Sequence, residues 1–112
     1  MSRIGTIDFK GMTGHKYTFN VYPLKNHFSK DKGAVYVVTQ RIVKADGMVD
    51  HNLLFVGTTE NISTVKNMVE TSTCFTREHA NCICTYWEDN SATRVKINDD
   101  LINFYHPPCN YE

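Results

Sequence analysis

The cysteines are the residues of this chain whose spacing points most directly to chemistry. There are four among 112 residues: Cys74, Cys82, Cys84 and Cys109. Cys82 and Cys84 have the two-residue period of a strand, which places both sulfur atoms on one face, and with Cys109 or His79 they would form a metal-binding group. The spacing matches no standard zinc pattern. Because we recognise no secretory signal, we expect buried, reduced thiols rather than zinc ligands or disulfides.

An asparagine and two histidines are the other candidates. Asn98 falls on the apolar stripe of a predicted helix, where a buried amide must either bond to backbone or water or line a cleft. The other members of this stripe are apolar or aromatic: Val95, Leu101, Ile102 and Tyr105. No nucleophile pairs with His51 or His79 in the sequence, so we interpret both as solvated loop residues.

The first half of the chain is dominated by strand patterns. Alternating apolar residues predict a hairpin over 7–21. A polar loop at 24–33 precedes two apolar runs, at 34–43 and 51–57, that predict a central strand pair covered on both faces. After Asn61, a good helix N-cap, apolar residues recur every three or four positions and predict a helix of about ten residues.

The second half alternates helix and strand. A loop leads to a short strand at 82–87, and a second helix spans about 91–105 before Pro107 and Pro108 stop it. Phe28, in the loop before the central strands, is expected to turn back into the core. The order ββ–ββ–α–β–α predicts one α+β domain over residues 1–112.

The composition is that of an ordinary globular domain. Hydrophobic residues make up 41%, charged residues make up 21%, and the net charge is zero, so the total charge gives no footprint for nucleic acid. No apolar run approaches the roughly 18 residues of a membrane span, and we expect a cytoplasmic protein. Residues 1–56 carry eight Lys or Arg against four Asp or Glu, the reverse of residues 57–112. Either folding averages this unevenness, or a basic face forms from Lys10, Lys16, Lys25, Lys30, Lys32 and Arg41.

Three segments together resemble the GIY-YIG nuclease superfamily. "AVY" at 34–36 and "FVG" at 55–57 stand for its two name-giving motifs on adjacent strands, and "DLINFYHPPCN" at 100–110 resembles its closing helix and tail. The likeness covers residues 33–110 and leaves 1–32 as an N-terminal hairpin extension. It implies a GIY-YIG-like small sheet with two packed helices.

The resemblance also implies which residues would do chemistry. The superfamily hydrolyses phosphodiesters, using tyrosine hydroxyls to position or deprotonate water, an arginine to stabilise phosphate charge and a glutamate to hold a divalent cation. Tyr36 and Asn110 match retained family positions. Phe55 replaces the second tyrosine, Val65 stands at the arginine position and Asn98 at the glutamate position. Because an amide is a poor ligand for a hard cation, we expect that hydrolysis has been lost.

These correspondences lead to three functional hypotheses. The first is a domain that has lost nuclease activity and serves as a binding or interaction module without a cofactor. The alternative is an active endonuclease with a rearranged site, using Mg or Mn and the nearby Lys66, Asp99 and Asp100. A purely structural protein, or a dimer through an edge strand, is the third. Nucleic acid is a candidate partner, and the sequence leaves the oligomeric state open.

The resemblance finally makes a geometric prediction. If Val65 and Asn98 occupy the vacated arginine and glutamate positions, both face one groove beside Tyr36. Tyr36 and Asn98 should then approach each other, with Val65 nearby. An open polar cleft there would favour the nuclease, and an apolar groove at Val65 would count against it.

Overall fold

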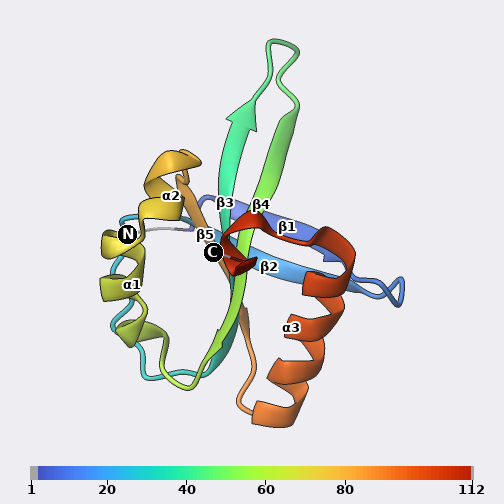
Figure 1. The fold of residues 1–112 in the computed structure, drawn as a ribbon, viewed down its shortest axis with the longest axis vertical. Helices are drawn as coiled ribbons and strands as arrows, with labels where there is room; N and C mark the ends of the chain where they lie inside the picture. The colour runs from blue at the N-terminus through green and yellow to red at the C-terminus, as the bar shows by residue number, and fades with distance from the viewer. Residues whose placement is uncertain (1–2, 112) are drawn as a thin grey trace.

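The computed structural model describes residues 3–111 and is built on one five-stranded antiparallel sheet (Figure 1). Along the chain the strands are β1 (Gly5–Lys10), β2 (Lys16–Pro23), β3 (Ala34–Val43), β4 (Val49–Thr59) and β5 (Cys82–Trp87). Their order across the sheet is β1-β2-β5-β3-β4, so β5 lies between the two hairpins and pairs with β2 and β3. The two predicted hairpins and the α+β class are confirmed.

The helical segments lie where the sequence changes period, with one addition. They are the 3₁₀ turn η1 (Ile62–Thr64), α1 (Lys66–Thr71), α2 (Thr73–Arg77), α3 (Ser91–Tyr105) and the 3₁₀ turn η2 (Pro108–Tyr111). The predicted ten-residue helix is η1 followed by α1, and Asn61 caps η1 by accepting from the Ser63 N–H. The predicted loop after it contains α2, because extended Ser72 ends α1 and its hydroxyl caps α2 at Phe75. None of these described helices is long and apolar enough to cross a membrane.

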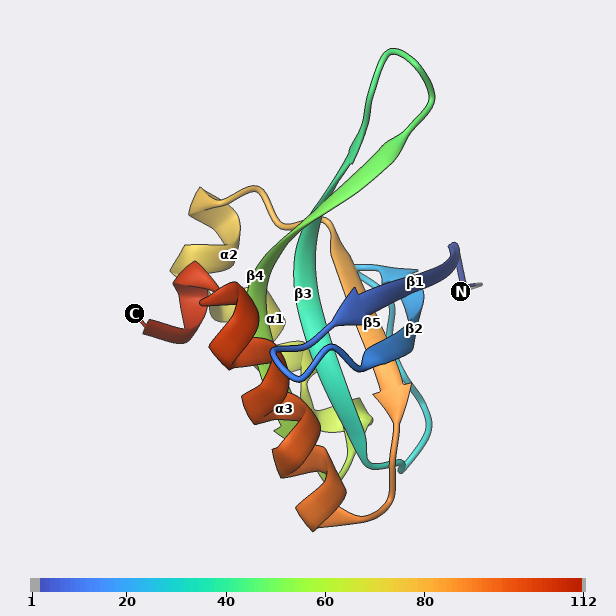
Figure 2. The same cartoon turned by 90° about the vertical axis from the view of Figure 1, so that its right-hand side faces the viewer.

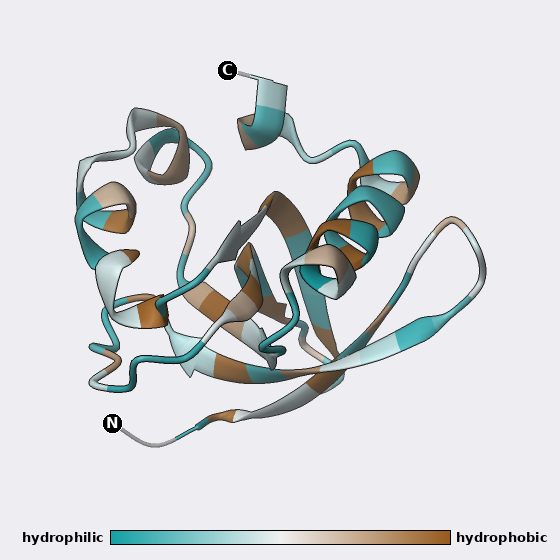
Figure 3. Ribbon diagram, turned by 90° about the horizontal axis from the view of Figure 1, so that it is seen from below, coloured by the Kyte–Doolittle hydropathy of each residue, from teal (hydrophilic) through white to brown (hydrophobic). Residues whose placement is uncertain are grey.

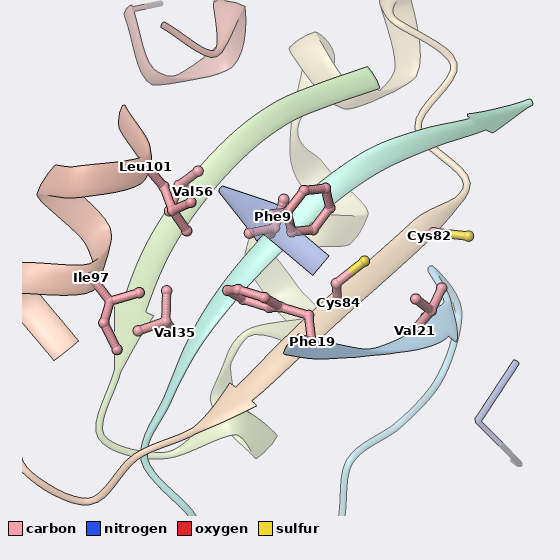
Figure 4. Packing of buried hydrophobic residues seen from close by; sticks show 10 residues of the cluster. Phe9, Phe19, Val21, Val35, Val56, Cys82, Cys84, Ile97 and Leu101 are labelled. Carbon is pink, nitrogen blue, oxygen red and sulfur yellow. The ribbon is translucent and has the colours of Figure 1, made fainter. Parts of the chain in front are cut away.

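The apolar run of β3 is continuous because both faces of this strand are covered. Val35 and Val37 belong to one buried cluster with Leu101 of α3, on what we name the α3 face. Figure 4 shows Val35 and Leu101 in this cluster. Tyr36 packs with Val65 on the opposite side, which we name the α1–α2 face. Figure 3 shows the short helices and α3 on opposite sides, with strands running between and below them. The prediction of a strand pair covered on both sides is confirmed for the inner part of β3, residues 34–39, and is wrong for its outer end, where residues 42 and 43 are exposed.

The buried stripe of α3 differs from the predicted one. Val95 is 51% exposed, and the buried residues of the helix are Arg94, Ile97, Asp100 and Leu101. Arg94 donates hydrogen bonds to the carbonyl oxygens of Glu88 and Asp89, at 2.9 and 2.8 Å. Charged residues can therefore take inward positions of this helix, because fixed partners offset the cost of burying them.

The β3–β4 hairpin extends beyond the rest of the sheet as an arm, residues 40–52 (Figures 1 and 2). β5 pairs with β3 only as far as Thr39, and past that point β3 pairs with β4 alone. Gly47, at φ +85°, closes the turn in left-handed backbone that favours glycine. The arm leaves apolar Val43 and Met48 exposed at its tip.

Candidate functional site

Tyr36 is the retained motif residue, and it is buried. It shares one cluster on the α1–α2 face with Phe55 and Val65, and the Tyr36 and Phe55 ring centroids are 5.9 Å apart. Its hydroxyl lies over Gly57, where an added β-carbon would come within 2.8 Å of the oxygen. Burial raises the pKa of Tyr36 to about 12, so the hydroxyl stays protonated at neutral pH.

Asn98 lies outside that cluster. It belongs to α3, whose Ile97 and Leu101 pack on the α3 face, whereas Val65 packs on the α1–α2 face. The Asn98 amide is half-exposed and donates to the neighbouring Asp99 carboxylate at 3.4 Å. Val65 and Asn98 thus belong to layers on opposite sides of the sheet. The prediction of one groove shared by Tyr36, Val65 and Asn98 is wrong.

The side chain of Asn110 is hydrogen-bonded to the backbone of β4. Its side-chain oxygen accepts from the backbone N–H of Val56 at 2.9 Å, and its amide nitrogen donates to the Val56 carbonyl at 2.8 Å. Val56 lies in β4, the last strand of the sheet. The side chain therefore satisfies the outward-facing backbone groups of an edge strand.

The cysteines differ from the expectation of four reduced thiols. Cys74 of α2 and Cys109 of η2 form a disulfide, while Cys82 and Cys84 are buried free thiols. Cys109 packs on the α1–α2 face and Cys82 and Cys84 on the α3 face, so the suggested metal group with His79 does not assemble. Within residues 3–111 no three His, Cys, Asp or Glu side chains are grouped as metal ligands.

The two candidate histidines, His51 and His79, differ in how far they are buried. His51 is half-buried, not solvated as predicted, and its Nδ1 lies 2.8 Å from the Thr39 hydroxyl. Burial and then Arg41 lower the pKa of His51, against a weaker opposing effect of Asp50. His79 is exposed, as expected.

Of the suggested substitutes, Lys66 forms a surface ion pair with Glu70 on α1. Asp100 belongs to α3 and is tied to the β1–β2 turn. Its carboxylate accepts from the Thr13 N–H and hydroxyl, both at 2.9 Å, and from the Tyr17 hydroxyl at 2.7 Å. Burial raises the pKa of Asp100, but these hydrogen bonds together lower it by more than burial raises it, so the net shift is downward. Burial, and then the hydrogen bond to Asp100, raise the pKa of Tyr17 to about 12. Asp100 is therefore an anchor between α3 and the first hairpin.

The α1–α2 face contains a cavity of about 380 Å³ between the 24–28 loop and η1–α1. We name it the loop–α1 pocket. Most of its wall is apolar, from Leu24, Phe28, Ile62, Val65, Val69 and Ile83. Phe28 turns inward as predicted and packs against Tyr22 and Trp87, with ring centroids 5.0 and 6.1 Å away. Phe28 and Val65 are 37 positions apart in the sequence, and the fold brings them together in the wall of one cavity.

The polar rim of the loop–α1 pocket carries more positive than negative charge. Lys25 and Lys66 line it, against Glu70, which pairs with Lys66 at 3.9 Å. Beside it, the ammonium groups of Lys30 and Lys32 each lie 6.0 Å from the Trp87 ring centroid. Part of the suggested basic face is thus gathered in the loop that borders the pocket.

Comparisons of the chain with models of known protein families, with curated proteins and with solved structures found no significant match in any of the three. The GIY-YIG resemblance therefore rests on the motif letters alone. The geometry of the described residues, rather than a relative, carries the functional argument.

Proposed function

We propose that this chain is a binding domain and that its site is the loop–α1 pocket. The observation that carries the proposal is the cavity of about 380 Å³ with an apolar wall and a cationic rim. Sites for small molecules commonly measure about 300–1,000 Å³, with apolar walls and few polar groups. This keeps the binding-module hypothesis from the sequence and gives it a location.

The chemistry of the pocket favours an amphipathic anion as its ligand. A single apolar chain would be buried against side chains such as Phe28 and Val69, gaining about 0.8 kcal/mol per buried methylene. An anionic head would stay at the rim, near Lys25 and Lys66. A medium-chain carboxylate such as decanoate combines these two features.

The setting of Tyr36 supports a binding role over phosphodiester hydrolysis. A phenol whose pKa is raised to about 12 in an apolar cluster is almost entirely protonated at neutral pH, so little phenolate is present to act as a general base. The surroundings of Val65 are an apolar cavity. That the core descends from a GIY-YIG-like nuclease is part of the proposal, and it rests on Tyr36, Phe55 and the 100–110 tail.

The direct test is a fluorescence titration with decanoate. Trp87, the one tryptophan of the chain, lies against Phe28 of the pocket wall and should report binding. We expect a saturable change with decanoate, weaker binding of decylamine, and a loss of about tenfold or more in affinity for Val69→Asp, because a carboxylate would enter an apolar wall. Val95→Asp, on exposed α3 surface, is the matched control.

Two outcomes would contradict the proposal. One is the absence of saturable binding by folded protein at millimolar decanoate. The other is cleavage of plasmid or RNA in magnesium or manganese that survives rigorous purification and disappears in Tyr36→Phe, which would restore the nuclease alternative.

A further inference from the structure

The C-terminal tail passes around the edge of the sheet. α3 ends at Tyr105 on one side, and Cys109 is bonded to Cys74 of α2 on the other. Figure 2 shows the tail running from the top of α3 toward α2. We name residues 107–110 the C-terminal latch. Its Pro107 is fully buried and Cys109 is 9% exposed, so the latch is part of the packed structure.

The latch occupies a position that a sixth strand would take. The two hydrogen bonds between the Asn110 side-chain amide and the Val56 backbone, one donated by each residue, match the pair that a residue of a neighbouring strand would exchange with Val56. Unpaired edges are templates for pairing with another chain, and proteins commonly protect them with charges or covers. Residues 52–59 of β4 include no Asp, Glu, Lys or Arg. The cover at Val56 is the latch.

The disulfide that fixes the latch lies in a setting suited to reduction. A cavity of about 480 Å³ borders it and is lined by both cysteines together with Phe55 and Phe75. The Arg77 guanidinium lies 3.3 Å from the Cys74 sulfur. Because a nearby cation stabilises a thiolate, Cys74 is the better leaving group of the pair.

We propose that the Cys74–Cys109 disulfide is a reducible lock on the β4 edge, and that its reduction lets β4 pair with β4 of a second copy of this chain. A thiolate of a dithiol reductant attacks the Cys109 sulfur, and the electron pair of the broken bond goes to Cys74. The second thiol of the reductant, once deprotonated, then displaces Cys109. The reductant becomes a disulfide, and two protons end on the two cysteines.

A second copy is the occupant that the edge favours. Two antiparallel β4 strands related by a two-fold axis present the same uncharged segment, 52–59, to each other, so no like charges meet there. Near the tip of the arm, Lys44 and Asp50 neutralise each other in an ion pair of 2.8 Å. This inference uses none of the residues that line the loop–α1 pocket and does not depend on the proposed ligand.

The test combines sedimentation with hydrogen exchange on the whole chain, oxidised and then treated with dithiothreitol. We expect the oxidised protein to be a monomer with a protected Val56 amide. Reduction should speed exchange at Val56 in dilute, monomeric protein by about tenfold or more, since local opening sets that rate. At higher concentration the reduced protein should dimerise. Circular dichroism confirms that the reduced chain is folded.

Two variants distinguish the parts of the inference. Asn110→Ala should speed Val56 exchange while the disulfide is intact, and Asn52→Lys should prevent dimerisation of reduced protein by placing a charge at the pairing edge. Lys96→Gln, on exposed α3 surface, is the control and should dimerise on reduction as the parent does. An unchanged Val56 exchange rate after reduction would overturn the lock. A reduced protein that stays monomeric, or a dimer that Asn52→Lys leaves intact, would overturn pairing through β4.

Discussion

Different interactions attach the helices to the two faces of the sheet. On the α3 face, one long helix buries four residues. Two of them, Arg94 and Asp100, are charged and are held by hydrogen bonds to the Glu88 carbonyl and the Tyr17 hydroxyl. On the α1–α2 face, α1 has no fully buried residue, α2 buries Cys74 and Phe75, and a disulfide ties α2 to the C-terminal latch. The two cavities described above, of about 380 and 480 Å³, are both lined by residues of these short helices.

This difference indicates that the two faces suit different roles. The α3 face has the close packing and satisfied polar contacts that stabilise a domain. The α1–α2 face leaves apolar wall exposed in cavities, which costs packing energy and suits ligand binding. The residues that resembled a nuclease site are distributed over both faces: Tyr36, Phe55 and Val65 pack on the α1–α2 face, whereas Asn98 is half-exposed on α3. The following changes should separate the two faces by their effects on stability.

The largest effect should come from the disulfide. Removing a cross-link that spans a sequence separation of 35 residues should lower the free energy of unfolding by about 4 kcal/mol on the chain-entropy account. Urea denaturation of the oxidised protein and of Cys74→Ser/Cys109→Ser measures this difference. Reductant should not destabilise the double variant further. A variant as stable as the oxidised parent would show that packing alone holds the α1–α2 face.

A smaller loss should follow from opening the core of the α3 face. Leu101 has no exposed surface, so Leu101→Ala should cost about 3 kcal/mol by removing buried methylenes and leaving a cavity. Val69→Ala, in the half-buried wall of the pocket, should cost less than about 1 kcal/mol. Thermal unfolding of the two variants compares the faces. Equal losses would remove the proposed difference in packing.

Much of the fold was accessible from local patterns. Alternation gave the hairpins, and the N-cap Asn61 and the stop at Pro107 bounded helical segments close to those found. The inward stripe of α3 was misjudged because Asp100 is buried by partners on the β1–β2 turn, more than eighty residues away in sequence. Propensity cannot register such a distant contact.

The candidate site was less accessible. The wall of the loop–α1 pocket comes from separate segments of the chain, so no local spacing marks it. The disulfide joins cysteines 35 residues apart, and sequence alone does not determine connectivity. Conversely, the motif letters at Tyr36 and Asn98 suggested proximity that the layered packing does not provide.

The smallest effect is expected from acid, through Asp100. Its pKa is lowered by folding, so its contribution to stability is present above its unfolded pKa of about 3.9 and is lost as pH falls through the folded value. Between pH 6 and pH 3 the parent should therefore lose more unfolding free energy than Asp100→Asn, while Asp99→Asn, an exposed neighbour, should behave like the parent. Urea titrations at each pH provide the comparison. Parallel curves for Asp100→Asn and the parent would show that the Thr13 and Tyr17 contacts do not favour the charged carboxylate.

The most direct test of the central claim, that the α1–α2 face binds ligand while the α3 face supports the fold, is a map of decanoate binding by amide chemical shifts. We predict saturable shifts concentrated in the 24–28 loop and at Ile62, Val65 and Val69, with the amides of Ile97 and Leu101 unchanged. Saturable shifts centred on α3, or none in folded protein at millimolar decanoate, would contradict it.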